Sequence, residues 1–170
     1  AAEKIDWRRS ARGKTLFVRE TELETARTVQ FWIDGTAGFD WASTPDLNTK
    51  ADVARILCLA VAIGLAGKGE RIGLLNAPRP AGTGKSAIAK FSQQICEFEP
   101  AIPAPPKTPG LLVLAGDFYD PIEDWKKRLE PLAKRCPAGV ILALNDPMEA
   151  DFPFKGRVHF NMPGGGLSRI

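Results

Sequence analysis

The chain has 170 residues, which is enough for one well-buried core and too few for two ordinary domains, so we expect a single domain over residues 1–170. Its hydrophobic content of 44% and charged content of 25% exclude a disordered or membrane-embedded protein. The 23 Lys and Arg residues against 20 Asp and Glu residues give a net charge of +3, which is too small to indicate a nucleic-acid partner.

Two strands are predicted before the first helix. The alternating residues 15–19 indicate a half-exposed edge strand, and the nearly continuous apolar run at residues 29–33 suits a strand covered on both faces. Thr49 is expected to cap the first helix, with Asp52 in capping-box position. Apolar residues on its other sides imply that this helix is deeply packed. Its expected buried side consists of Val53, Ile56, Leu57, Ala60, Ile63 and Gly64.

The rest of the chain alternates between predicted strands and helices, with a Pro-rich connector in the middle. This order predicts right-handed βαβ units and therefore an α/β fold with a mostly parallel sheet. Strands are expected at residues 71–76, 111–115, 140–144 and 157–160, a helix at residues 85–98, and the connector at residues 100–109.

A further helix is predicted to begin at residues 120–123. Asp120 is its expected N-cap, Pro121 its first residue and Glu123 the returning capping group. Pro131 is expected to kink or end this helix near Glu130, because proline lacks the backbone N–H that a helix interior needs.

Asp34 is the residue that the sequence places most clearly for chemistry, because it follows the apolar run at residues 29–33. In an open parallel sheet, ligands bind outside the carboxyl ends of the strands. Thr36 could add a hydroxyl to the Asp34 carboxylate, and oxygen ligands are those that Mg²⁺ prefers. Asp-Gly is also a common turn sequence, so the alternative that Asp34 has only a structural role in a turn stays open. Asp117 and Asp146 end later strands, and the three carboxylates are expected to meet at one edge.

The sequence Gly-Thr-Gly-Lys-Ser at residues 82–86 is similar to the end of a phosphate-binding Walker A loop. The first glycine of that motif would be residue 79, which is Arg79, and the neighbouring Pro78 and Pro80 cannot donate amide hydrogen bonds. A flexible loop before a helix is the simpler interpretation.

Cys58, Cys96 and Cys136 are widely spaced and indicate neither a disulfide framework nor a zinc site. No secretory signal is visible, and the longest apolar run, at residues 56–66, is too short to span a bilayer. We therefore expect a cytoplasmic location and no membrane segment in this chain.

The N-terminal residues carry a longer pattern. Residues 5–12 read Ile-Asp-Trp-Arg-Arg-Ser-Ala-Arg, and residues 16–20 read Leu-Phe-Val-Arg-Glu, followed by Glu22 and Glu24. This pattern resembles the signature of domain-of-unknown-function family 58, and the similarity extends over about residues 5 to 160. The resemblance implies a von Willebrand factor type A-like fold, which is a Rossmann-like, doubly wound, mostly parallel sheet with helices on both faces. Residues 1–27 would then be the family-signature segment with its edge strand.

The resemblance also implies a function. Proteins of this family are often encoded beside MoxR-type AAA+ ATPases, and such pairs are thought to assist the assembly or maturation of other proteins. The implied function is a non-enzymatic protein-interaction module, and its implied partner is a MoxR-type AAA+ ATPase or a client of that ATPase. Family members commonly have a membrane hairpin and a further β-rich segment upstream, so we expect a short relative or an excised domain.

Type A domains commonly carry a metal-ion-dependent adhesion site, built from Asp-x-Ser-x-Ser after the first strand, a threonine from a second loop and an aspartate from a third. Asp34 and Thr36 match the first two positions, whereas Gly38 offers no side-chain ligand at the third. Asp117 matches the later aspartate, and Thr83 is the candidate threonine by its position. The resemblance therefore implies a degenerate Mg²⁺ site at these four residues.

An enzymatic alternative is a magnesium-dependent phosphohydrolase that resembles the haloacid dehalogenase superfamily. In that interpretation Asp34 is the nucleophile, because an aspartate after a buried strand can accept a phosphoryl group. Such an enzyme would need a second aspartate at the position of Thr36, and the acidic pair Asp117 and Asp120 matches its later motif only in part.

Overall fold

The computed structural model describes residues 10–11, 26–97, 102–157, 159–161 and 167–169. The predicted edge strand at residues 15–19 and nearly all of the N-terminal signature lie outside the described residues. The helices and strands are β1 (Thr28–Ile33), α2 (Lys50–Gly67), β2 (Arg71–Leu74), α3 (Gly84–Glu97), β3 (Leu111–Gly116), α4 (Ile122–Ala133), β4 (Ala138–Ala143), α5 (Pro147–Asp151), β5 (His159–Asn161) and β6 (Leu167–Arg169).

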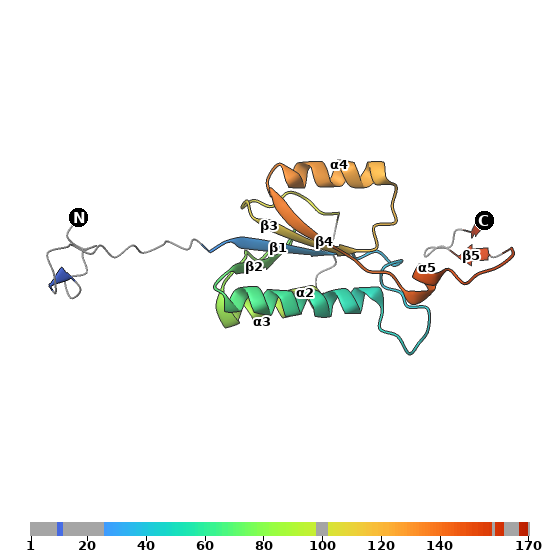
Figure 1. Ribbon diagram of the computed structural model, residues 1–170, viewed down its shortest axis with the longest axis horizontal. Helices are drawn as coiled ribbons and strands as arrows, with labels where there is room; N and C mark the ends of the chain where they lie inside the picture. Colours follow the sequence, from blue (N-terminus) through green and yellow to red (C-terminus); the bar gives the residue numbers. More distant parts are fainter. Residues whose placement is uncertain (1–9, 12–25, 98–101, 158, 162–166, 170) are drawn as a thin grey trace.

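Four of the strands form one parallel sheet in the order β2-β1-β3-β4. The chain runs from β1 outward to β2 and then returns past β1 to β3 and β4, so the winding direction changes between β1 and β3. Helices α2 and α3 cover one face of the sheet and α4 covers the other (Figure 1). This arrangement confirms the predicted α/β, Rossmann-like fold. Strands β5 and β6 form a separate antiparallel pair.

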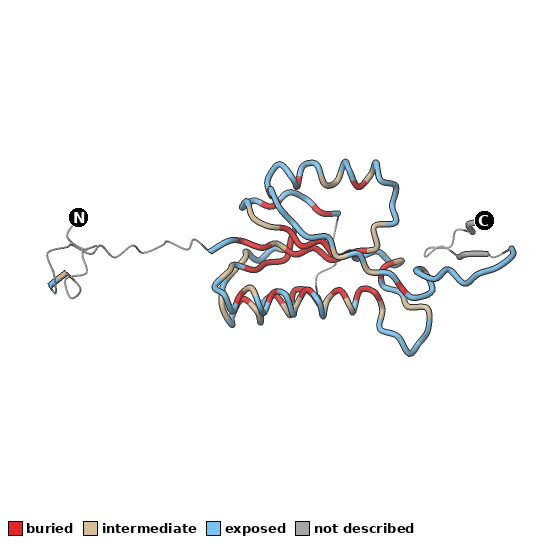
Figure 2. Tube along the Cα trace, in the orientation of Figure 1, coloured by how far each residue is buried: buried red, intermediate tan, exposed pale blue. Residues whose placement is uncertain are grey.

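Two apolar layers hold the sheet between its helices. Alternate side chains of β1 enter different layers, as the two-residue period of a strand requires. The Phe31 ring lies 4.9 Å from the Phe91 ring of α3 in one layer, and the Trp32 ring lies 5.9 Å from the Trp125 ring of α4 in the other. Figure 2 shows the buried residues concentrated in the strands and on the sheet-facing sides of the helices.

The core-facing side of α2 differs from the predicted one. Its apolar buried positions hold only small residues, which let the helix approach the sheet and α3 closely. Four of its larger apolar side chains lie on the outer side and are between 41% and 61% exposed, whereas Leu59 and Leu65 are partly buried against the core. The prediction of a deeply packed helix is therefore wrong. The buried positions are Lys50, Ala51, Ala54, Cys58, Ala62 and Ala66, and the exposed apolar ones are Ile56, Leu57, Val61 and Ile63.

Helix α4 also begins differently from the prediction. Pro121 occupies the N-cap position without a side-chain capping bond, and the Asp120 carboxylate instead accepts a hydrogen bond of 2.5 Å from Arg128. Pro131 lies within the last turn, and the helix continues to Ala133. A proline so close to the end of a helix leaves few backbone bonds beyond it to disrupt.

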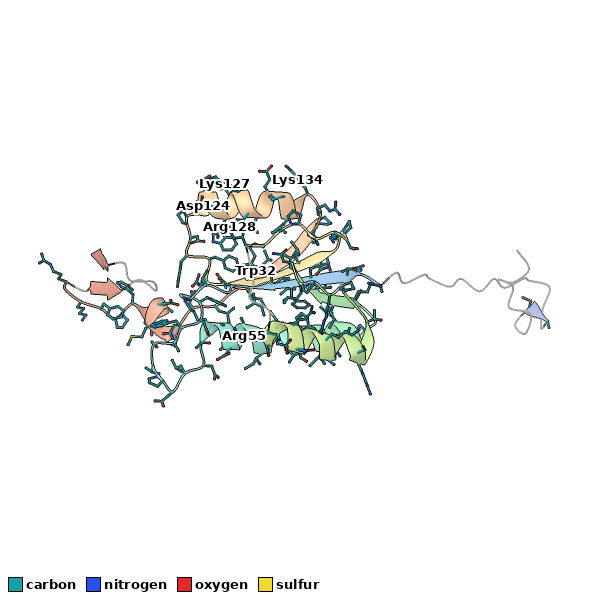
Figure 3. All side chains as sticks on the ribbon, turned by 180° about the vertical axis from the view of Figure 1, so that it is seen from behind. Trp32, Arg55, Asp124, Lys127, Arg128 and Lys134 are labelled. Carbon is teal, nitrogen blue, oxygen red and sulfur yellow. The ribbon has the colours of Figure 1, made fainter. Side chains whose placement is uncertain are left out.

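The outer side of α4 is polar. Lys127 and Lys134 point away from the sheet and pair with acidic residues of the same helix, whereas Arg128 lies against the Trp125 ring (Figure 3). No helix in the described part of the chain combines the length and the apolar character that crossing a bilayer requires.

Candidate functional site

Strands β1, β3 and β4 are parallel and therefore end at the same edge of the sheet. The loop after each strand carries an aspartate: Asp34, Asp117 and Asp146. We call residues 34–36, 117–120 and 146–149, together with Lys50 of α2, the strand-end site. The structure brings the three aspartates to one edge, as the strand pattern predicted.

Asp34 continues the pairing of β1 beyond the strand. Its N–H donates to the Ala115 carbonyl at 2.8 Å, and its Oδ1 accepts the N–H of Thr36 at 2.8 Å. The Asp34 side chain lies on the same face of the sheet as Trp32, which is the face that α4 covers. It packs closely over Gly116, because a Cβ built at Gly116 would lie 3.4 Å from Asp34 Cβ and Oδ2. Asp34 is only 7% exposed, although a cleft of about 20 Å³, roughly the size of one water molecule, reaches it.

This environment makes Asp34 an unusual carboxyl group. Burial raises the pKa of Asp34, the hydrogen bonds from Thr36 oppose that rise, and the nearby carboxylates of Asp117 and Asp120 add to it. The net pKa lies above the ordinary value. Thr36 therefore stabilises the charged form of Asp34, and the neighbouring acids disfavour it.

Asp117 is held from the opposite face of the sheet. Its Oδ2 accepts from Lys50 Nζ at 3.0 Å, and the same ammonium donates to Glu149 Oε1 at 2.7 Å. Lys50 is the first residue of α2 and is only 4% exposed. Burial lowers the pKa of Lys50, but the hydrogen bonds to Glu149 and Asp117 outweigh it, so the pKa lies above its usual value and the side chain stays charged.

Asp146 joins the end of β4 to the loop after β1. Its carboxylate accepts from the Ser43 N–H at 3.0 Å and from the Met148 N–H at 2.8 Å, and it forms a capping box with Glu149. Burial raises the pKa of Asp146, but these hydrogen bonds and the nearby Lys50 lower it below its usual value. Three loops and two helices are thus tied together around one lysine.

Thr83 lies far from this edge. Ile72, near the start of β2, exchanges backbone hydrogen bonds of 2.8 and 2.9 Å with Gly82. Ile72 lies opposite Val29 of β1, so Thr83 is near the amino ends of the strands. Five positions of extended strand separate Val29 from Asp34, which is roughly 16 Å. The loop after β2 runs back along that strand, which position in the sequence alone does not reveal.

The residues present do not fit a ready magnesium site. Mg²⁺ needs oxygen ligands at about 2.1 Å in a near-octahedral arrangement. Asp34 lies buried on the α4 face, Asp117 is paired with Lys50, and Thr83 is at the other end of the strands. In the described ranges no group of three or more His, Cys, Asp and Glu side chains is arranged to hold a metal ion. Binding of Mg²⁺ stays a prediction from the sequence, and this donor set does not favour it.

Sequence reasoning missed Lys50, the residue at the centre of the site. A signal was present, because a lysine at the first position of a helix faces the positive end of the helix dipole and is disfavoured there unless acidic groups surround it. Its partners Asp117 and Glu149 are 67 and 99 residues away in the chain, and no local pattern connects them.

The family model described as "Protein of unknown function DUF58" matches residues 1–168 of the chain. No curated protein and no solved structure matches the chain. The family match confirms the resemblance carried by the N-terminal signature and extends it over nearly all of the 170 residues. The chain therefore belongs to the DUF58 family of proteins of unknown function.

Proposed function

We propose that this domain is a non-enzymatic protein-interaction module whose contact surface is the strand-end site together with the neighbouring Trp41. The observation that carries the proposal is a pair of exposed aromatic side chains above a fixed charge network. Trp41 is 42% exposed and Tyr119 is 59% exposed, and the rings of both lie within 6.0 Å of Lys50 Nζ. Exposed Trp and Tyr residues are typical anchors of protein interfaces, because each buries a large area at a small entropic cost.

The charges of the site suit a partner with a basic surface. The exposed Asp40 and Asp120 adjoin Trp41 and Tyr119 in the chain, and the buried ammonium of Lys50 is already paired with two carboxylates. A basic partner would be attracted electrostatically, and this attraction would weaken with salt. The family resemblance suggests a MoxR-type AAA+ ATPase or its client, acting in assembly or maturation of other proteins.

Binding of the purified chain to a purified MoxR-type ATPase of the same source would test the proposal. The double substitution Trp41→Ser and Tyr119→Ser is expected to weaken binding at least about tenfold, since aromatic hot spots contribute roughly 2 kcal/mol or more. Ile63→Ser is the control, because Ile63 is similarly exposed at 48% but lies thirteen positions along α2 from Lys50, which is roughly 20 Å.

The double variant and the Ile63→Ser control distinguish the proposed contact surface from the exposed apolar side of α2. Binding that survives the double substitution but is lost in Ile63→Ser would assign the contact to the exposed apolar side of α2. Absence of binding to the ATPase and to any client presented with it would remove the proposed partner class.

The phosphohydrolase alternative stays a prediction of the sequence. The site offers it little support, because Thr36 stands where the second aspartate is needed and the Asp34 carboxylate already accepts the Thr36 N–H. Burial also raises the pKa of Asp34, which disfavours the anionic form that a nucleophile requires. Phosphate release from an aryl phosphate, present in the wild type and absent in Asp34→Asn, would nevertheless establish it.

A further inference from the structure

Lys50 occupies a position where a lysine is costly. Lysine is seldom fully buried, yet Lys50 is 4% exposed. It also stands at the first position of α2, where the helix dipole repels a positive charge. A lysine that is both buried and placed against the helix dipole needs compensating contacts, and those contacts indicate its role.

The compensating contacts come from two later parts of the chain. Asp117, after β3, and Glu149, in α5, both bond the Lys50 ammonium, at 3.0 and 2.7 Å. The two carboxylates are themselves only 15% and 23% exposed, so solvent screens these pairs weakly. One ammonium thus connects the start of α2 to the loop after β3 and to α5.

Aromatic rings complete the surroundings of the ammonium. The ring centroids of Phe39, Trp41 and Tyr119 lie 5.8, 6.0 and 5.5 Å from Lys50 Nζ. Ring faces attract a cation at such distances, and the attraction is larger where water is excluded. Two carboxylates and three rings therefore enclose a single positive charge.

We propose that Lys50 is the built-in cation of the strand-end site and takes the place that a divalent metal ion would have in an adhesion site. The ammonium already occupies Asp117 Oδ2, the oxygen that a metal ion would need. A metal ion bound to that carboxylate would lie within roughly 5 Å of the ammonium, and two positive charges at that distance repel each other. The site is therefore independent of divalent metal ions, and removal of the lysine side chain creates a site for one.

This inference concerns the chain alone and does not rest on the proposed partner, so a metal titration tests it separately from partner binding. Wild type, Lys50→Ala and Lys50→Gln would each be titrated with Mn²⁺ and Mg²⁺ by calorimetry, and their melting temperatures measured with and without chelator. Lys85→Ala is the matched control, because Lys85 is exposed in the first turn of α3.

The wild type and Lys85→Ala are expected to give no binding heat and no metal-dependent shift in melting temperature. Lys50→Ala is expected to bind Mn²⁺ at least about tenfold more tightly than the wild type, and metal would restore part of its lost stability by mass action. Adding Asp117→Asn to Lys50→Ala should abolish that binding, which places the metal ion at the strand-end site.

Saturable Mn²⁺ or Mg²⁺ binding to the wild type, lost in Asp117→Asn, would overturn the proposal, because the lysine would then coexist with a metal ion. Failure of both Lys50 variants to bind metal would overturn it too. If Lys50→Ala does not fold, Lys50→Gln keeps a long polar side chain without the charge, and the wild-type titration remains decisive by itself.

Discussion

Asp34 illustrates how a single residue in this site combines structural and chemical roles. Its backbone extends the pairing of β1 with β3, and its carboxylate closes the turn at Thr36. The same carboxylate is buried beside Asp117 and Asp120, which makes its charge unfavourable. A residue kept in this state reduces stability locally, as is common at functional sites.

The substitution Asp34→Asn is expected to stabilise the folded protein near neutral pH. The pKa of Asp34 is raised on folding, so the folded state binds the proton more tightly than the unfolded state does. Wild-type stability therefore increases as the pH falls through the raised pKa and is lowest above it. Asn keeps an oxygen that accepts the Thr36 N–H but carries no charge. Urea unfolding at about pH 7 should give a higher free energy of unfolding for the variant than for the wild type, and this difference in stability should shrink toward about pH 4.

Asp46→Asn is the control for this comparison, because Asp46 is an exposed aspartate in the loop between β1 and α2. Its stability is expected to follow that of the wild type at both pH values. An Asp34→Asn variant that is less stable than the wild type near neutral pH would show that the carboxylate makes a net favourable contact in the folded state.

Among the helices, α2 depends on its first turn to position Lys50. Thr49 accepts a hydrogen bond from the Asp52 N–H at 3.1 Å and donates its hydroxyl to Asp40 Oδ1 at 2.9 Å. Thr49→Ala removes both bonds and is expected to lower the free energy of unfolding by about 1 kcal/mol, as for other N-cap losses. Chemical denaturation would measure the change, and Asn48→Ala, at the exposed residue before it, should have little effect. An unchanged stability in Thr49→Ala would mean that the cap contributes nothing.

Two glycines give a second comparison between elements. A Cβ at Gly110, just before β3, would lie 2.2 Å from the Thr28 carbonyl oxygen, so the backbone of β1 would have to move. Gly110→Ala is expected to destabilise the fold by about 3 kcal/mol. Apart from its chain neighbours and the backbone of its own helix, a Cβ added at Gly64 in α2 would meet no atom within 4 Å, and Gly64→Ala should stabilise the fold by about 0.5 to 1 kcal/mol. Thermal melts in which both substitutions change the melting temperature in the same direction would contradict this account.

The comparison between pattern and structure is also clearest at the level of elements. The apolar run of β1 predicted a buried strand that ends at Asp34, because strand burial is visible in the local pattern. The alternation of strands and helices along the chain predicted the parallel sheet, and with it the edge where Asp34 lies. Helix α2 was predicted with the wrong side buried, since its small and large apolar residues both recur at helical spacing. Which set faces the sheet depends on how closely the helix can approach it. The position of Thr83 and the contacts of Lys50 depend on tertiary pairing and were not predictable from spacing.

At the scale of the whole molecule, the sheet is unequally covered. The outer edge of β2 is partly covered, because Ile72 pairs with Gly82 in an antiparallel β-bridge. The outer edge of β4 has no partner strand within the residues that the structure describes. Val140 and Ile141 of β4 are each 55% exposed, and a groove of about 250 Å³ runs between β4 and α4. An open edge with apolar side chains is a template for pairing with another chain.

We therefore expect the chain to associate in a concentration-dependent way through β4. A lysine on an edge strand opposes such pairing, because its charge would be buried without a partner in the joined sheet. Val140→Lys should shift sedimentation-velocity profiles toward the monomer at concentrations where the wild type associates. Ile63→Lys makes the same change at a similarly exposed apolar residue of α2 and should leave association unchanged if β4 is the contact. Equal dissociation by both variants would assign the association to general surface hydrophobicity, and a wild type that stays monomeric throughout would show that the open edge of β4 is not used.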